Sequence, residues 1–200
     1  MLFNEMGLNG SLLEAVNDLG FTTPTAIQIS VIPAILESRD DLIALAQTGT
    51  GKTASFGLPI VQLTEVQEFD TQSLILCPTR ELCMQITKDL QDYAKFTKGV
   101  KIVPVYGGAS AEPQIKSVKK GAQIIVGTPG RTLDLIKRKV LKVGKIKWLV
   151  LDEADEMLNM GFKEDLDAIL AGTPDRKQTL LFSATMPKEI LRIANTHMHD

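Results

Sequence analysis

Cysteine and aromatic residues are scarce in this sequence of 200 residues, and it has no long apolar run. It contains two cysteines, one Trp and two Tyr. Two cysteines are too few for a disulfide framework, so we expect reduced thiols and a cytoplasmic protein. No apolar stretch approaches the ~20 residues that a membrane helix needs. The first residues also lack the basic and apolar segments of a secretory signal. These features argue against disulfide-rich secreted domains and membrane-spanning proteins.

Net charge is also small, because 22 basic and 24 acidic residues leave −2. The charge is unevenly distributed, however. Residues 116–147 hold ten Lys or Arg and one acid, Asp134, whereas the rest of the chain has 12 basic and 23 acidic residues, a net charge of −11. Such a stretch is typical of a nucleic-acid-binding surface or of a solvated lysine face. Composition leaves both interpretations open.

Short apolar runs alternate with helical patterns along the chain. The expected strands are residues 42–45, 74–77, 102–105, 124–126, 148–151 and 180–182, and the expected helices are residues 11–19, 53–64, 81–97, 131–138 and 162–170. Strands that are almost wholly apolar are typical of parallel sheets covered on both faces. Their alternation with helices predicts an α/β fold with helices on both faces of a parallel β-sheet. No linker or repeat interrupts the pattern, so we predict one domain over residues 1–200.

Unusual short motifs follow the carboxyl ends of all six expected strands. They occupy residues 46–53, 78–82, 107–108, 128–131, 152–155 and 183–185. Parallel strands end at the same edge of a sheet, and α/β proteins bind ligands at that edge. The sequence therefore predicts one composite site.

The first motif has the spacing of a Walker A phosphate-binding loop, with Ala in place of the first Gly. Its members are Ala46, Gln47, Thr48, Gly49, Thr50, Gly51, Lys52 and Thr53. The glycines allow backbone N–H groups to surround phosphate oxygens, and the following helix directs its positive end toward them. Lys52 would contact the β- and γ-phosphates, and the hydroxyl of Thr53 would bind Mg²⁺.

Asp152 and Glu153 follow an apolar strand, which is the arrangement of a Walker B motif. Asp152 would hold Mg²⁺, partly through water, because Mg²⁺ keeps much of its hydration shell. Glu153 would orient and deprotonate the attacking water. An Asp-Glu pair alone is usually a solvated helix start, but together with a Walker A loop it predicts a nucleotide-hydrolysing site.

The string Asp152-Glu153-Ala154-Asp155 gives the DEAD-box helicases their name, and the sequence resembles that family along nearly its whole length. Phe3, Gly20, Phe21, Pro24 and Gln28 resemble the adenine-reading Q motif, here at residues 3–28. Residues 46–53 resemble the family's motif I, residues 78–82 motif Ia and residues 107–108 the glycine doublet. Residues 128–131 resemble motif Ib, residues 152–155 motif II and residues 183–185 motif III. The resemblance implies a RecA-like P-loop NTPase domain, the ATP-binding domain of an ATP-dependent RNA helicase, with ATP and Mg²⁺ as cofactors.

The resemblance also implies roles for the Q motif. The amide of Gln28 has the donor and acceptor that adenine presents in complementary form. Phe21 would stack on the base, with plain core packing as the alternative, and the backbone at Thr23 would join the contact.

For RNA, the resemblance implies contacts to the sugar-phosphate backbone of a single strand. The residues concerned are Pro78, Thr79, Arg80, Gly107, Gly108, Thr128, Gly130 and Arg131. Hydroxyls, backbone N–H groups and Arg contact phosphates without reading bases. For Arg80 an ion pair with Glu81 or a neighbouring acid is the alternative. Ser183 and Thr185 join Lys52, Asp152 and Glu153 as expected catalytic residues.

Residues 137–147 lead into the amino end of the strand that carries Asp152. They are therefore expected at the edge of the sheet opposite the site, as a solvated face. Cys77 and Cys83 are expected to be small buried side chains. His197 and His199 have no Cys or acidic cluster near them in sequence, so no metal site is expected at this frayed end.

The family's second RecA-like domain, which carries an arginine finger, is expected to be absent from these 200 residues. The piece should then be a monomer with little activity of its own. Two alternatives remain: a nucleotide-gated RNA clamp without unwinding activity, and a RecA-like ATPase of another pathway.

Overall fold

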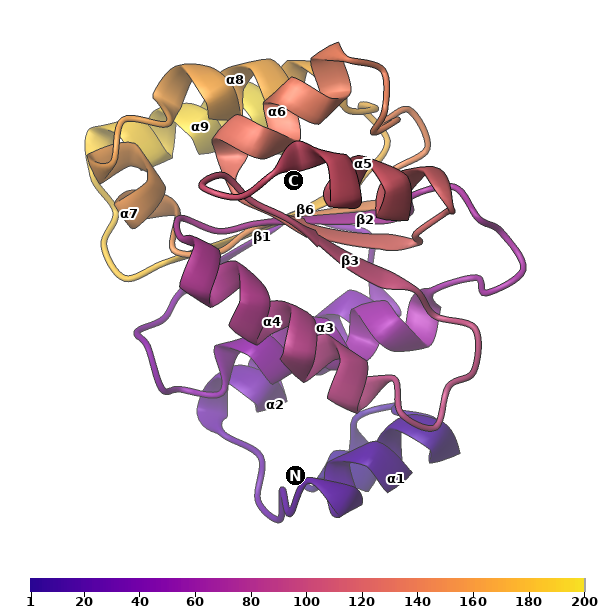
Figure 1. Ribbon diagram of the computed structural model, residues 1–200. Helices are drawn as coiled ribbons and strands as arrows, with labels where there is room; N and C mark the ends of the chain where they lie inside the picture. The colour runs from indigo at the N-terminus through magenta and orange to yellow at the C-terminus, as the bar shows by residue number, and fades with distance from the viewer. Residues whose placement is uncertain (200) are drawn as a thin grey trace.

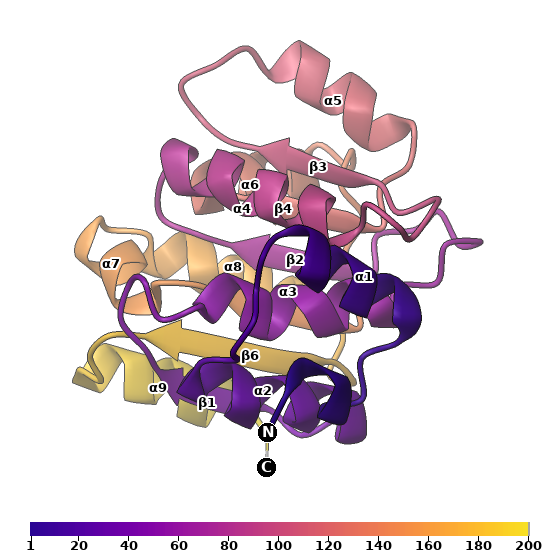
Figure 2. The ribbon, with the colours of Figure 1, turned by 90° about the horizontal axis from the view of Figure 1, so that it is seen from below.

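Residues 1–199 of the computed structural model form a six-stranded parallel sheet between two layers of helices (Figure 1). The strands are β1 (Leu42–Leu45), β2 (Ser73–Leu76), β3 (Ile102–Val105), β4 (Ile124–Gly127), β5 (Trp148–Leu151) and β6 (Gln178–Ser183). Their order in the sheet is β1-β6-β5-β2-β4-β3, and every neighbouring pair is parallel. Figure 2 shows the strand arrows pointing the same way. The α/β fold predicted from the sequence is confirmed.

The helices divide between the two faces of the sheet. One layer holds α1 (Gly10–Asp18), α2 (Ala26–Glu37), α3 (Lys52–Leu63) and α4 (Arg80–Tyr93), and the short 3-10 helix η1 (Phe3–Glu5) precedes them. The other layer holds α5 (Ala111–Lys119), α6 (Pro129–Lys137), α7 (Ala154–Asn159), α8 (Lys163–Gly172) and α9 (Lys188–His197). None of the helices described is long and apolar enough to cross a membrane.

The molecule has two hydrophobic cores, one on each face of the sheet, and successive side chains of the central strands pack into them alternately. Ile75 and Val150 pack with the layer of α1–α4, whereas Leu74, Leu76 and Leu149 pack with the layer of α5–α9. All five are fully buried. This two-sided burial is the physical reason that these strands are apolar at every position rather than at every second one.

Strand β1 departs from the expectation of coverage on both faces. It lies at one end of the strand order and pairs with β6 alone among the described residues. Ile43 is 44% exposed and Leu45 is 65% exposed, whereas Leu42 and Ala44 pack against the α1–α4 core. An apolar run reads the same at the centre and at the edge of a sheet, so the sequence did not reveal this difference.

Helices α2, α5, α7 and α9 were not among those expected from the sequence. Two of them contain proline, Pro33 in α2 and Pro113 in the first turn of α5, but so does α3 with Pro59, which was expected, so proline alone does not account for the difference. The expected helix 81–97 ends at Tyr93. Helix α9 continues through His197, whose Nε2 lies 3.3 Å from Asp167 Oδ1, so the expected fraying is wrong for this residue.

Gly127, the last residue of β4, permits close packing at the site edge of the sheet. A Cβ added there would collide with Thr132 Oγ1 and lie 2.9 Å from Val105 Cγ2. We expect Gly127→Ala to lower the free energy of unfolding by about 1–3 kcal/mol through overpacking. Urea unfolding should show a lower midpoint with an unchanged slope. Gly172→Ala is the control, because a Cβ at Gly172 meets nothing within 4 Å. Equal midpoints for the two variants would contradict the packing argument.

Candidate nucleotide and RNA site

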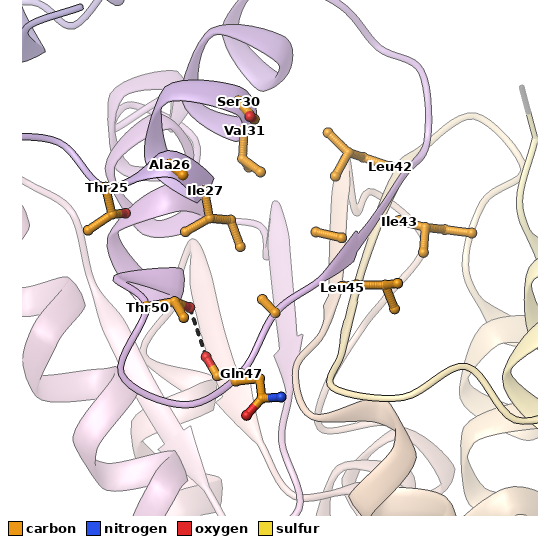
Figure 3. Close-up of a pocket in the computed structure, with 12 residues that line it drawn as sticks. Thr25, Ala26, Ile27, Ser30, Val31, Leu42, Ile43, Leu45, Gln47 and Thr50 are labelled. Carbon is orange, nitrogen blue, oxygen red and sulfur yellow. Dashed lines mark hydrogen bonds between the residues drawn. The ribbon is translucent and has the colours of Figure 1, made fainter.

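The Walker A loop joins the carboxyl end of β1 to the first residue of α3, Lys52. Gly49 has φ 83° and Gly51 has φ 79°, the left-handed region that favours glycine. Within the loop, the hydroxyl of Thr50 donates to the carbonyl of Gln47 at 2.8 Å (Figure 3). The positive end of α3 thus faces the loop, as binding of phosphate requires.

Gln28 lies against this loop and is 5% exposed. Its Nε2 donates to the carbonyl of Gly51 at 3.2 Å, and its Oε1 accepts from the N–H of Thr25 at 3.0 Å. A Cβ at Gly51 would lie 2.5 Å from that Nε2, so only glycine fits there. The structure therefore places Gln28 in contact with the phosphate loop, which the sequence did not indicate. Its contact with adenine stays a prediction.

Phe21 lies on the surface near the start of α2. Its side chain is 37% exposed, and its ring stacks on that of Phe3 with centroids 6.4 Å apart and planes at 26°. Phe3 is buried, so it supports one side of the Phe21 ring. Thr23, two residues on, is exposed as well. Phe21 therefore packs against the core through Phe3 without being buried in it, and its stacking on adenine stays a prediction.

Lys52 and Asp152 meet across the carboxyl edge of the sheet. The Nζ atom of Lys52 lies 2.8 Å from Oδ1 of Asp152, and both side chains are buried. Neither oxygen of Asp152 accepts a well-oriented hydrogen bond from the described residues. Burial raises the pKa of Asp152, and the Lys52 ammonium opposes that rise. A buried carboxylate with one oxygen on an ammonium and the other without a partner among the described residues fits a hard cation such as Mg²⁺.

Glu153 occupies a strained position at the start of α7. Its φ of 52° is in the left-handed region, which is uncommon for a residue other than glycine. Such strain is concentrated at functional sites. Burial, together with the neighbouring carboxylates of Asp152, Asp155 and Glu156, raises the pKa of Glu153, while Lys52 lowers it. A raised pKa makes Glu153 a better proton acceptor, as a general base needs to be.

Asp155 connects the ends of the neighbouring strands β5 and β6. Its Oδ2 accepts from the hydroxyl of Thr185 at 2.8 Å and from the N–H of Thr185 at 3.1 Å. The hydroxyl of Ser183 donates to the carbonyl of Thr185 at 2.7 Å. Burial raises the pKa of Asp155, but these hydrogen bonds outweigh burial, so the net shift is downward. Ser183 and Thr185 thus hold the acidic motif in position, and their expected part in catalysis stays a prediction.

The residues expected to hold RNA also lie along the carboxyl edge. Thr79 caps α4, because its hydroxyl accepts from the N–H of Leu82 at 3.2 Å. The N–H of Gly107 donates to the hydroxyl of Thr128 at 3.4 Å, which joins the ends of β3 and β4. Gly107, Gly108 and Gly130 are exposed, and a Cβ on any of them would meet nothing within 4 Å. Pro78 is buried beneath this surface.

Arg80 and Arg131 differ in how they are held. Arg80 is exposed and lies 5.0 Å from the ring centroid of Tyr106. No described acid lies in ion-pair range of Arg80, so the alternative, an ion pair with Glu81 or a neighbouring acid, is wrong. Arg131 donates at 2.9 Å to both Gln114 Oε1 and the carbonyl of Ala109. Arg131 therefore supports the loop that carries the glycine doublet.

Gln114 and Tyr106 are the residues that sequence reasoning missed. Gln114 Nε2 donates to the carbonyl of Tyr106 and Gln114 Oε1 accepts from its N–H, both at 3.1 Å. Tyr106 immediately precedes Gly107, so an aromatic residue beside the doublet was a usable signal. Gln114 belongs to no motif, and nothing in the sequence around it indicates its role.

A cavity of about 760 Å³ lies beside the phosphate loop, along the outer edge of β1 (Figure 3). Side chains of α2 and β1, including Ile27, Val31 and Ile43, make it largely apolar. Of the predicted site residues it takes in Ala46, Gln47 and Thr50 but neither Lys52 nor Asp152. This cavity is therefore not the phosphate site itself.

The two cysteines behave as expected, because Cys77 and Cys83 are free thiols and fully buried. The interaction with Cys83 and burial both raise the pKa of Cys77, which keeps it from reacting as a thiolate. Cys77 directly follows β2 rather than belonging to it.

A glycine-bearing loop after β1, joined by an ion pair to a buried acid at the end of β5, the next strand but one in the sheet, defines a P-loop nucleotide-binding domain. The family model for the DEAD/DEAH box helicase matches residues 25–193. The chain belongs to this family.

Curated relatives extend the match. The chain is 54% identical over 193 residues to the DEAD-box ATP-dependent RNA helicase CshA of Streptococcus pneumoniae, covering 96% of this chain and 36% of the relative. It is 52% identical over 200 residues to the ATP-dependent RNA helicase CshA of Limosilactobacillus reuteri, covering 100% of this chain and 40% of the relative. The chain thus spans well under half the length of these relatives.

Solved structures agree with the fold. A DEAD box protein from Methanococcus jannaschii superposes with a TM-score of 0.96 at 46% identity, covering 100% of this chain and 54% of that protein. A hypothetical ATP-dependent RNA helicase from Sulfolobus tokodaii gives a TM-score of 0.89 at 37% identity, covering 96% of this chain and 56% of that protein. The sheet and its helices are therefore those of the RecA-like domain of DEAD-box proteins.

Proposed function

We propose that this chain is the ATP-binding domain of an ATP-dependent RNA helicase. It would bind ATP with Mg²⁺, hold single-stranded RNA along the same edge of the sheet and, with a second RecA-like domain, couple hydrolysis to local unwinding. The observation that carries the proposal is the contact between Lys52 and the fully buried Asp152 at 2.8 Å. Buried ion pairs of this kind are costly to form, so a function that uses both charges accounts for their retention.

Binding of a nucleoside triphosphate would give both charges new partners. Lys52 would turn to the phosphate oxygens, which accept strong charge-assisted hydrogen bonds. Asp152 and the hydroxyl of Thr53 would hold Mg²⁺, which would neutralise charge that develops on the phosphates. Gly49 and Gly51 would leave room for backbone N–H groups to approach the phosphates.

Glu153 would act on the water. Its partial burial and its acidic neighbours raise its pKa, so its carboxylate would accept a proton from a water held beside it. Asp155 and Thr185 fix the start of α7 through two hydrogen bonds, and they thereby keep Glu153 in place.

RNA would lie across exposed groups at the same edge. Gly107, Gly108 and Gly130 offer backbone without side chains, and Arg80 is exposed beside them. Such contacts recognise phosphate and sugar rather than bases. The domain would therefore bind RNA without sequence preference. It would act as a monomer, in the cytoplasm, where RNA and ATP occur together.

A nucleotide-gated RNA clamp would use the same residues, so strand separation is the property that distinguishes it from a helicase. The full-length protein should separate a short RNA duplex in the presence of ATP. Hydrolysis of ATP without strand separation would favour the clamp.

Adenine selectivity tests the nucleotide half of the proposal. We expect the chain to bind ADP more tightly than GDP and Gln28→Ala to lower this preference by about 1–3 kcal/mol, the value of a bidentate base contact. Because Gln28 also holds Gly51, its loss should weaken both nucleotides, so the ADP-to-GDP ratio is the informative quantity.

Calorimetric titration of both nucleotides into wild type and Gln28→Ala measures that ratio. Gln85→Ala, an exposed glutamine on α4, is the matched control and should leave the ratio unchanged. Equal affinity of the wild type for ADP and GDP would contradict adenine recognition.

A further inference from the structure

The edge of the sheet opposite the nucleotide site carries a concentration of positive charge. At this edge lie the loops that precede β2, β4, β5 and β6. A hollow of about 540 Å³ opens between the loops that precede β2, β4 and β5. Lys119, Lys120, Lys139 and Lys142 surround the hollow, and all four are exposed. We call these four lysines the basic rim.

Three acids near the basic rim are engaged in ion pairs, whereas Glu68, directly before Phe69, is exposed and has no ion pair among the described residues. Asp70, the one acidic residue that lines the hollow, pairs with Lys145 at 2.8 Å. Glu65 pairs with Lys147 at 3.1 Å, and Asp134 pairs with Arg138 at 3.1 Å. No rim lysine has a carboxylate within 4.0 Å among the described residues. Four like charges around one hollow repel each other, and a bound polyanion would relieve that repulsion.

The positive charge continues along the same edge. A second hollow of about 410 Å³ lies at the entries to β5 and β6, and it is lined by Arg39, Lys147, Arg176, Lys177 and Gln178. In the sheet β6, β5, β2 and β4 are successive neighbours, so the two hollows are separated by roughly 5–15 Å at the usual strand spacing. One extended ligand can therefore reach both.

An aromatic side chain lies at the margin of the basic rim. Phe69 is 62% exposed and lines the first hollow, and Lys101 Nζ lies 5.8 Å from its ring centroid. Exposed aromatic rings beside a groove of cations are how single-stranded nucleic acids are held without sequence preference, because each base offers a face for stacking. An acidic protein segment would use the cations but would gain little from an exposed Phe.

We propose that the basic rim, with Phe69, is a second binding surface for single-stranded RNA, separate from the nucleotide edge. The charge distribution supports one polyanion path, because residues 116–147 hold ten basic residues and one acid, whereas the rest of the chain has a net charge of −11. RNA that leaves the nucleotide edge would be repelled by most of the surface and attracted by this rim. The lysines are solvated at the edge opposite the nucleotide site, as expected from the sequence, and the proposal adds a ligand for them.

Binding of a fluorescein-labelled oligouridine to the 200-residue chain, measured by anisotropy over a series of salt concentrations, tests the proposal. The rim variant combines Lys119→Gln, Lys120→Gln and Lys142→Gln. Lys139 is left unchanged, because its φ of 60° is in the left-handed region and a substitution there could change backbone strain as well as charge. The control variant removes three exposed lysines elsewhere, namely Lys88→Gln, Lys98→Gln and Lys188→Gln, and so has the same net charge.

We expect the rim variant to bind the oligouridine at least about tenfold more weakly than the control variant at low salt. At roughly 0.7 per phosphate contact, its slope of log K against log salt should fall by about 2. Phe69→Ala should weaken binding without changing the slope, because it removes stacking but no charge. Equal affinity of rim and control variants would overturn the proposal. So would a polyglutamate peptide that binds the wild type as tightly as the oligouridine at the same salt concentration.

Two further measurements separate this surface from the proposed nucleotide site. ADP affinity should be the same in the rim variant and the wild type, and Arg80→Gln, which removes the exposed arginine at the nucleotide edge, should keep most of the salt-dependent oligouridine binding. Oligouridine binding that disappears in Arg80→Gln but survives in the rim variant would place the RNA at the nucleotide edge alone and would refute the basic rim.

Discussion

Glu153→Gln is expected to lower ATP hydrolysis by the full-length protein by about 10² or more while ATP binding survives. Gln keeps the size and hydrogen-bonding capacity of Glu but cannot accept a proton, and general-base catalysis typically contributes 10²–10⁴ in rate. The contacts of Lys52 with Asp152 and of Asp155 with Thr185 do not involve Glu153, so the binding surface should stay intact. Phosphate release and nucleotide titration on the same samples measure the two effects.

Glu164→Gln is the matched control, since Glu164 is exposed in the first turn of the next helix, α8, and does not act on the pKa of Glu153. It should hydrolyse ATP at the wild-type rate. Wild-type turnover by Glu153→Gln would mean that another group accepts the proton.

Glu153→Gln should also be more stable than the wild type near neutral pH. Burial and neighbouring carboxylates raise the pKa of Glu153 in the folded protein above its usual 4.5, so the folded state holds that proton more tightly than the unfolded state does. Stability from this residue therefore falls as pH rises through the raised pKa. Melting temperatures of wild type and variant should converge at pH values below 4.5 and separate, in favour of the variant, toward neutrality.

The second large effect concerns the 200-residue chain on its own. We expect it to unfold cooperatively, because both faces of its central strands are buried, yet to show no detectable RNA-stimulated ATP hydrolysis. Lys52, Asp152 and Glu153 lie at one edge of this domain, and a second RecA-like domain would close over that edge. An arginine finger supplied by such a domain would be worth roughly 10³–10⁵ in rate. RNA held at the basic rim would not replace it, because that rim lies at the opposite edge.

Phosphate release with and without polyuridine at low salt measures RNA-stimulated hydrolysis for the chain alone and for the chain joined to a second RecA-like domain. Strong stimulation should require the longer protein. Robust stimulation of the 200-residue chain would show that the second domain is dispensable, and the proposed mechanism would then be wrong.

The sequence by itself determined the α/β class and the edge on which the site lies. Apolar runs such as Leu149–Leu151 are readable locally, because a strand buried on both faces needs apolar side chains at every position. The spacing of Gly49, Gly51 and Lys52 is equally local, since a loop that surrounds phosphate is made of consecutive residues. Motifs that each follow a parallel strand must meet at one edge, whatever the order of the strands.

The tertiary structure decided which motifs touch. Asp155 reaches Thr185 because β5 and β6 are neighbours, and β1 exposes Leu45 because it lies at the edge of the sheet. Gln28 holds Gly51, and Gln114 holds Arg131, across 23 and 17 residues of chain. The basic rim likewise forms where the loops into several strands converge. These contacts depend on strand order and on helix packing, which arise from the energy of the whole core and leave no periodic pattern in the sequence.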